Sequence, residues 1–374
     1  MAATGVTGLR NGIGPHAGLL LTGLATFVLM GFGQALFGPA LPEMTRLFDL
    51  RDGTAGMLVS AQWVGSAVGV AVMYVWSQHV GPRLALAMMA LGGAGLALQP
   101  AWGLVLLSAV VFGIGYGMVA AVFNPRVLRA FGVRGVSMLS LLNAAYAAGA
   151  IVSPLAFVAL DNSSRIAFGI AVAGYVAIWL FASDRQGGGP AFRPQRTGFR
   201  PHWPVLVFAA IGIGVEASLA GLGPTALVRA GHSEEAAAQL LSAFFFAFLM
   251  SRIVLGVVAH RFGSFTIYAA AIVLAVGALL VAVSGATGAG FVTMGVSAGM
   301  FFPGTFVTAS RKMGEDPRVT PVILAAGLVG GIGLPLVLSE LTAGMGPLGF
   351  FWLLLAITLP TALAALASLR GMAR

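Results

Sequence analysis

The sequence contains no cysteine, which excludes disulfides, thiolate metal sites and cysteine nucleophiles. Charge is scarce too: Asp, Glu, Lys and Arg make up 8% of the 374 residues, and only 11 residues are acidic. The five histidines lie near the ends of apolar segments, and no HExxH, GxSxG or paired-carboxylate motif occurs. These absences argue against an enzyme, and they predict no metal site and no cofactor.

Apolar residues dominate the chain. They account for 59% of it, and the mean hydropathy of +0.97 is far above that of a water-soluble domain of this length. A helix needs about 20 apolar residues to cross about 30 Å of hydrocarbon, and long continuous runs favour helices over a β-barrel. The sequence therefore predicts an all-α membrane protein with twelve transmembrane helices. The expected spans are 17–40, 54–77, 83–100, 102–126, 136–160, 165–183, 203–229, 236–259, 264–286, 288–311, 319–344 and 347–369.

The basic residues are distributed unequally between the two sides of these spans. With the N-terminus inside, 15 of the 20 basic residues fall in inner segments, four (Arg46, Arg51, Arg165 and Arg229) in outer segments, and Arg252 within a span. Because basic loops stay on the cytoplasmic side, we expect a multi-pass protein of the bacterial cytoplasmic (inner) membrane with both termini in the cytoplasm. The wide scatter of basic residues also argues against nucleic acid as a partner, despite a net charge of +9.

The longest polar stretch lies at the middle of the chain. Residues 184–202 combine Gly, Pro and Arg, which is typical of a flexible linker. We expect this linker to be cytoplasmic and to join an N-terminal six-helix bundle, residues 1–183, to a C-terminal six-helix bundle, residues 203–374.

The two halves repeat each other at a constant offset: adding 182 to a position in the first half gives its counterpart in the second. Matching pairs are Pro42 and Pro224, Gly81 and Gly263, Gly117 and Gly299, Arg129 and Arg311, Gly132 and Gly314, and Gly149 and Gly331. Such a repeat predicts two pseudo-symmetric bundles related by an axis along the membrane normal, with a binding site at their interface.

Four segments carry a more specific pattern. They are residues 31–48, 113–125, 141–155 and 214–227, and the last reads GVEASLAGLGPTAL. The chain resembles the major facilitator superfamily over its whole length, and these segments are most similar to the fucose permease-like sugar:proton symporters. The resemblance implies the major facilitator fold and the transport of a small, sugar-like metabolite with protons as the coupling ion.

The chain departs from that family pattern at acidic positions. In the symporters, one carboxylate on helix 1 and one on helix 4 serve binding and coupling, but the matching positions here are Gly38 and Ala120. Gln78 and His260 likewise stand where the inner loop motifs of the superfamily carry an acid.

Glu216 is the acidic residue predicted to lie deepest in the membrane. Its distance from Trp203, where the span begins, corresponds to about 20 Å of helix. Such a carboxyl group can bind and release a proton as a cavity alternates between sides, unless a nearby cation holds it ionised. The offset relates Glu216 to Gln34, so we assign both to substrate binding and Glu216 also to proton coupling. The alternative is a purely structural hydrogen bond or ion pair.

Arg252 is the other ionisable group of interest within a span. It can extend towards the cytoplasm, pair with Glu216, or bind an anionic group of a substrate. Glu340, by contrast, is expected near the outer end of its helix, as a gate or a solvated residue.

Uncharged polar side chains complete the candidate site. Gln62, Tyr116, Asn124, Asn143 and Tyr146 fall within the expected spans and could bind substrate through hydrogen bonds or aromatic stacking. The alternative for each is packing or a hydrogen bond between helices.

These features together imply a monomeric secondary transporter in the lipid bilayer that binds a small-molecule substrate. The first alternative is an efflux transporter for an amphiphilic or anionic compound, since the symporter acids are missing and Arg252 is present. A receptor or scaffold ranks last because no long soluble segment is present outside the central linker.

Overall fold

The computed structural model describes residues 16–51, 53–54, 56–76, 80–131, 134–183, 200–314 and 318–373. This part of the chain contains twelve α-helices and one short 3-10 helix, η4 (Ala259–Arg261). The α-helices are α1 (Ala17–Leu47), α2 (Gly56–Trp76), α3 (Pro82–Leu98), α4 (Trp102–Phe131), α5 (Gly135–Ala159), α6 (Ser164–Phe181), α7 (Trp203–Arg229), α8 (Glu234–Val258), α9 (Ser264–Val283), α10 (Thr287–Met313), α11 (Val319–Thr342) and α12 (Gly349–Ala373).

The twelve predicted spans are confirmed as helices, and their lengths suit a membrane. Within the described residues, eleven helices are long and apolar enough to cross a bilayer, while α3 is apolar but shorter, with 17 residues. Large apolar side chains cover the outer surface, such as Phe181, which is 85% exposed, and Leu98, which is 70% exposed. Such a surface is stable in contact with lipid rather than water. The chain is therefore a multi-pass membrane protein.

Two helices continue further than the sequence predicted. The first span was expected to end at residue 40, but α1 contains Pro39 and Pro42 and continues to Leu47; similarly, α4 passes through Pro125. Membrane helices tolerate internal proline because neighbouring helices and side chains satisfy the freed backbone groups. As a consequence Glu43 also lies within a helix, where its carboxylate accepts a 2.7 Å hydrogen bond from the backbone N–H of Ser164.

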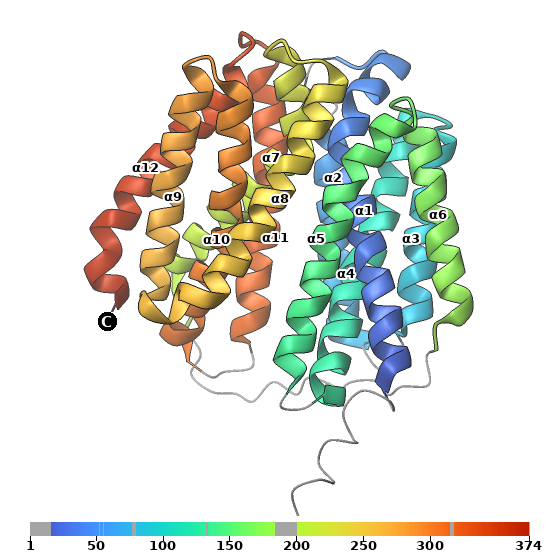
Figure 1. Ribbon diagram of the computed structural model, residues 1–374, viewed down its shortest axis with the longest axis horizontal. Coiled ribbons are helices and arrows are strands. Elements are labelled where there is room, and N and C mark those ends of the chain that lie inside the picture. Colours follow the sequence, from blue (N-terminus) through green and yellow to red (C-terminus); the bar gives the residue numbers. More distant parts are fainter. Residues whose placement is uncertain are drawn as a thin grey trace, which may run out of the picture.

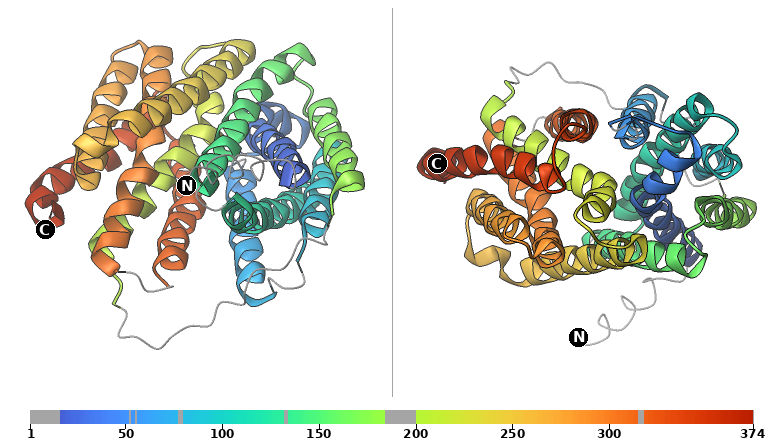
Figure 2. Two further views of the ribbon diagram at one scale, coloured as in Figure 1. Left: turned by 60° about the horizontal axis from the view of Figure 1, so that its bottom comes forward. Right: turned by 90° about the horizontal axis from the view of Figure 1, so that it is seen from above.

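The helices form two bundles, α1–α6 and α7–α12, which stand side by side in Figures 1 and 2. Contacts within one bundle are repeated in the other: α1 packs on α5 as α7 packs on α11, and α2 packs on α4 as α8 packs on α10. The main contacts between bundles pair α2 with α11, α5 with α8, and α1 with α7. Residues 184–199, most of the expected linker, lie outside the described residues.

Close helix packing at small residues shows where the internal repeat holds. A Cβ atom at Gly117 would overlap the carbonyl oxygen of Ser66, and a Cβ atom at Gly299 would lie 2.6 Å from that of Phe248. Gly299 and Phe248 are the positions that the offset assigns to Gly117 and Ser66. The predicted offset therefore holds for α2 and α8 and for α4 and α10.

The offset changes from 182 to 181 in α5 and α11. Gly149 packs on the carbonyl of Val28, and the matching contact to Ala210 is made by Gly330. Gly331, which the sequence offset paired with Gly149, instead faces the ring of Trp63. The predicted pairing of Gly149 with Gly331 is therefore wrong by one residue. Because Gly330 and Gly331 are adjacent, a match of glycine to glycine in the sequence cannot show which of them corresponds to Gly149.

Two hydrogen bonds between the bundles repeat the same symmetry. The hydroxyl of Ser60 on α2 donates to the carbonyl oxygen of Ile332 on α11 at 2.9 Å. The hydroxyl of Ser242 on α8 donates to the carbonyl oxygen of Ile151 on α5 at 2.7 Å. Ser60 and Ser242 are related by the offset of 182, and Ile151 and Ile332 by the offset of 181. The two hydrogen bonds are therefore the same contact, made once in each half of the repeat.

Further contacts between the bundles lie at the end of the molecule where α1 ends and α2 begins, here called the α1–α2 end. The guanidinium of Arg46 forms a two-point ion pair with Glu234 at the start of α8. The hydroxyl of Ser339 on α11 donates to the carbonyl oxygen of Gly53 at 2.5 Å and accepts from the N–H of Gly56 at 3.2 Å. In Figure 1 this end is at the top, and the ribbons of the two bundles diverge towards the bottom.

Candidate functional site

The helices α1 and α7 cross at a point where the chain allows no side chain. A Cβ atom at Gly38 would lie 2.5 Å from the carbonyl oxygen of Ala220 and 3.0 Å from Cγ of Pro224. The offset of the repeat relates Gly38 to Ala220, so the crossing lies on the pseudo-symmetry axis. A carboxylate of the kind that the symporter resemblance implies at position 38 has no room in this arrangement.

Gln34 and Glu216 each lie one helical turn before this crossing. Residues one turn apart share one face of a helix, so each side chain points towards the partner helix. Oε1 of Gln34 and Oε2 of Glu216 are both buried, and neither has a hydrogen-bond partner among the described residues. Glu216 is the central residue of α7. The two positions that the repeat pairs thus lie on α1 and α7, the helices that cross between the bundles.

Aromatic side chains of the N-terminal bundle form a group beside these residues. The hydroxyl groups of Tyr116 on α4 and Tyr146 on α5 are 3.3 Å apart and hydrogen-bonded. The ring of Trp63 on α2 packs edge-on against Tyr116, with ring centroids 6.5 Å apart. The indole Nε1 of Trp63 is buried without a partner among the described residues. Trp63 also faces Gly331 of α11, so this group borders the other bundle.

Arg252 on α8 is held by two contacts within its own bundle. Its Nε donates to the carbonyl oxygen of Gly299 on α10 at 3.2 Å. Its guanidinium carbon lies 4.2 Å from the centre of the Phe248 ring, one turn earlier on α8. Such a cation–π contact fixes the orientation of a guanidinium while leaving its other edge for a ligand. Sequence reasoning missed Phe248, although its spacing of one helical turn from Arg252 was a readable signal.

Glu216 and Arg252 do not form an ion pair. No ion pair within 4.0 Å joins these two described residues, whereas one does join Arg46 and Glu234. Tyr116 and Tyr146 of the N-terminal bundle and Glu216 and Arg252 of the C-terminal bundle all lie within their helices and not at the ends. The direct pairing of Glu216 with Arg252, one of the predicted alternatives, is not present in this conformation.

The remaining predicted site residues have different surroundings. Gln62 is fully buried at the contact of α2 with α4, and both of its amide atoms lack a partner among the described residues. Oδ1 of Asn124 is buried and likewise unpartnered there. Asn143 is exposed, and its Nδ2 donates to the carbonyl oxygen of Leu139 on its own helix at 2.9 Å. Glu340 is exposed at the end of α11, as the sequence predicted.

Arg126 is a buried cation that sequence reasoning placed in an inner loop. The expected span ended at residue 126, but α4 continues to Phe131, and Arg126 is only 8% exposed. Its position directly after an internal proline gave no signal of burial.

Comparison with known proteins agrees with this architecture. The sequence matches the family described as the Major Facilitator Superfamily over residues 23–338. A search of curated protein sequences found no match. Among solved structures, the chain is similar to a bacterial homologue of the human lysosomal transporter Spinster in an inward-facing, unoccupied conformation, with a TM-score of 0.73, 14% identity, and coverage of 95% of this chain and 96% of that one.

Two further structures show the same likeness. A D-xylose–proton symporter aligns with a TM-score of 0.71 and 14% identity, over 93% of this chain and 96% of that chain. A point mutant of the nucleoside transporter NupG aligns with a TM-score of 0.72 and 13% identity, over 93% of this chain and 99% of that chain. At these identities the likeness concerns the fold.

Proposed function

We propose that this chain, which belongs to the major facilitator superfamily, moves a small polar, sugar-like metabolite across the membrane by alternating access, with protons as the coupling ion. It is a transporter and not an enzyme. The observation that carries the substrate proposal is the group formed by the hydrogen-bonded Tyr116 and Tyr146 with Trp63, which faces Gly331 of the other bundle.

Unpartnered polar atoms around this region support a polar substrate. A buried donor or acceptor without a partner costs about 1–3 kcal/mol, so such atoms persist where water or a ligand satisfies them. Gln34, Trp63 and Glu216 all carry such atoms. Together they offer amide, indole and carboxyl groups, which suit a compound with several hydroxyl groups, and aromatic faces suit the apolar face of a sugar ring.

The orientation of the chain assigns a conformation to the structure. With both termini in the cytoplasm of a bacterium, as the distribution of basic residues predicts, the α1–α2 end faces outwards. The hydrogen bonds between bundles at that end then hold the outer side together. For transport, the contacts of Arg46 with Glu234 and of Ser339 with Gly53 must break when the bundles rock.

Glu216 is the proposed coupling group because of its position. It lies at the middle of α7 and beside the pseudo-symmetry axis, so either side of the membrane can supply its proton as the bundles alternate. Arg252 is near enough to interact with its charge but not to neutralise it in an ion pair. Protonation of Glu216 would therefore alter the net charge of the site, and with it the affinity for substrate.

The test is flux in proteoliposomes containing the purified protein, a pH-sensitive dye and a panel of sugars. We expect an imposed pH gradient to drive uptake of a panel member in the wild type, and this response to vanish in Glu216→Gln. Glu340→Gln is the matched control, because this acid is exposed at a helix end. Unchanged pH-driven flux in Glu216→Gln would remove Glu216 as the coupling group, and proton-independent uptake would remove coupling altogether.

Efflux of an amphiphilic or anionic compound is the second candidate. Arg252 stacked on Phe248 provides a positive charge beside an aromatic face, and Phe302 and Phe306 on α10 pack with ring centroids 5.2 Å apart. Such groups suit a ligand with an anionic end and an apolar body. Flux of amphiphilic anions out of vesicles, with no uptake of any sugar, would favour this function over the first.

A further inference from the structure

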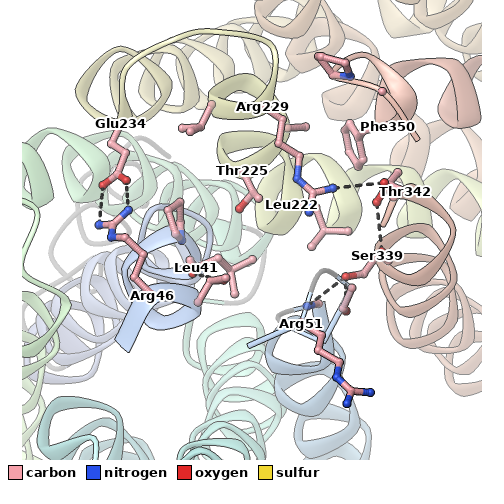
Figure 3. A pocket seen from close by; sticks show the side chains of 18 residues that line it. Leu41, Arg46, Arg51, Leu222, Thr225, Arg229, Glu234, Ser339, Thr342 and Phe350 are labelled. Atoms are coloured by element: carbon pink, nitrogen blue, oxygen red, sulfur yellow. Dashed lines mark hydrogen bonds and ion pairs between the residues drawn. The ribbon is translucent and has the colours of Figure 1, made fainter. Parts of the chain in front are cut away.

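A cavity lies between the bundles at the α1–α2 end, away from the central residues. Its volume is about 230 Å³, and it is bounded by residues of α1, Arg51 to the start of α2, α7, the start of α8, the end of α11, and Gly346 to the start of α12. Figure 3 shows Arg46 and Glu234 on one side of it and Arg229, Thr342 and Phe350 on the other. The cavity is large enough for a carboxylate- or phosphate-bearing metabolite.

The lining of this cavity is basic, although the end of the molecule around it is acidic. Six described acidic residues lie at the α1–α2 end, and one of them, Glu234, lines the cavity. Four described arginines lie at the same end, and Arg46, Arg51 and Arg229 line the cavity, whereas Arg165 does not. A membrane protein has few basic residues on its outer side. The gathering of three of them at one cavity therefore indicates an electrostatic role.

The three arginines make different contacts. The charge of Arg46 is neutralised by its two-point contact with Glu234. Nη1 of Arg229 donates to the carbonyl oxygen of Thr342 at 3.3 Å, which orients the guanidinium across the cavity. Arg51 lies at the rim, and in Figure 3 its guanidinium points away from Thr225. Arg229 is thus oriented by the cavity wall, and Arg51 also lines the cavity.

Thr225 supplies a hydroxyl group beside Arg229. It precedes Arg229 by one helical turn and therefore lies on the same face of α7. Its Oγ1 is buried and has no partner among the described residues. A guanidinium and an unpartnered hydroxyl on one helix face are the kind of donors that bind an oxyanion.

We propose that this cavity is an oxyanion-binding entry site, in which Arg229 and Thr225 bind a carboxylate or phosphate group of the transported compound. The inference rests on the proposed function and narrows its substrate to polar compounds with an acidic group, such as sugar acids. Arg229 ends α7 and Glu216 lies at its middle, which separates them by about 20 Å along the helix. An anion bound here is therefore held outside the central site, and Arg252 is the next positive charge available to it once the bundles open.

The test measures binding rather than transport, so its failure is distinct from failure of the proposed function. The full chain in phosphatidylcholine nanodiscs is heated in chloride, inorganic phosphate or glucuronate at equal ionic strength, and its unfolding is followed by tryptophan fluorescence. We expect phosphate and glucuronate to raise the melting temperature in a concentration-dependent way, and glucose to have no effect through this cavity.

Variants locate the effect. Arg229→Gln should weaken the apparent affinity about tenfold or more, Thr225→Val should weaken it less, and Arg229→Lys should retain part of it and control for folding. Arg165→Gln is the matched control and should behave as wild type. The proposed entry site would be contradicted if neither anion stabilised the protein, or if Arg165→Gln and Arg229→Gln lost the stabilisation equally. It would also be contradicted if adding phosphatidylglycerol to the nanodiscs stabilised the protein while the soluble anions did not.

Discussion

The two bundles share a scaffold but carry different chemistry at their interface. Ser60 and Ser242 make the same hydrogen bond to the opposite bundle, and Gly149 and Gly330 make the same close approach. The positions that line the central site do not match in this way. Tyr116 corresponds to Ala298, and Glu216 to Gln34.

This difference separates the constraints of packing from those of binding. Contacts to a backbone carbonyl have one geometry, so duplication preserves glycine and serine where helices touch. A substrate has no two-fold symmetry, so its site gains from phenol and indole groups on one side and charges on the other. We infer that the N-terminal bundle supplies neutral, aromatic contacts and the C-terminal bundle supplies the charges.

The largest effect is expected when a methyl group is added at the two matched glycines, which tests whether the bundles share one scaffold. A Cβ atom at Gly149 or Gly330 would overlap the carbonyl oxygen of Val28 or Ala210. We expect Gly149→Ala and Gly330→Ala to destabilise the protein similarly, by about 1–3 kcal/mol, as measured by thermal unfolding in detergent. Gly333→Ala, with nothing within 4 Å, should be neutral or slightly stabilising. Tolerance at one of the two sites alone would contradict the symmetry.

A smaller effect, on the conformational equilibrium, is expected when either of the two matched hydrogen bonds between the bundles is removed. Ser60→Ala and Ser242→Ala each remove one contact between bundles, worth about 0.5–1.5 kcal/mol. Both should shift the population towards a state that is open at the α1–α2 end, by similar amounts. Because the chain has no cysteine, spin labels on introduced cysteine pairs can measure the distance between the two bundles at the α1–α2 end. Thr293→Ala, which removes a bond within α10 to Ala289, is the control. A shift from one serine alone would show that the two contacts are not equivalent.

The smallest effect is expected from the ion pair of Arg46 with Glu234. The side chain of Arg46 is 61% exposed, and exposed pairs contribute only about 0.2–1 kcal/mol. Arg46→Gln should therefore shift the same label distance slightly at low salt and not at about 1 M salt, where charges are screened. An equally large shift at both salt concentrations would mean that Arg46 acts by packing.

The sequence predicted the scaffold well because the features that form it are local. Apolar runs set the twelve helices, and the constant offset between the halves holds for α2 with α8 and for α4 with α10. It failed where a feature depends on neighbours in space. α4 continues past the expected end at residue 126, and Gly330 rather than Gly331 makes the repeated contact.

The candidate site was predicted in part for the same reason. Depth within a span follows from residue number, which identified Glu216, Tyr116 and Tyr146. The direction of a side chain depends on the packing of several helices, so the sequence did not predict that Nδ2 of Asn143 donates to the carbonyl oxygen of Leu139 on its own helix. The cavity of Arg229 could not be predicted because its lining comes from segments far apart in the sequence.

The most direct test of the central claim moves the acid between the two matched positions. pH-driven flux is measured in proteoliposomes for the wild type, Glu216→Gln, and the double variant Gln34→Glu with Glu216→Gln. If the bundles share a scaffold and Glu216 alone carries the coupling, flux is lost in the single variant and partly restored in the double variant. Full pH-driven flux in Glu216→Gln would contradict the account, and a double variant as inactive as the single one would contradict the equivalence of the two positions.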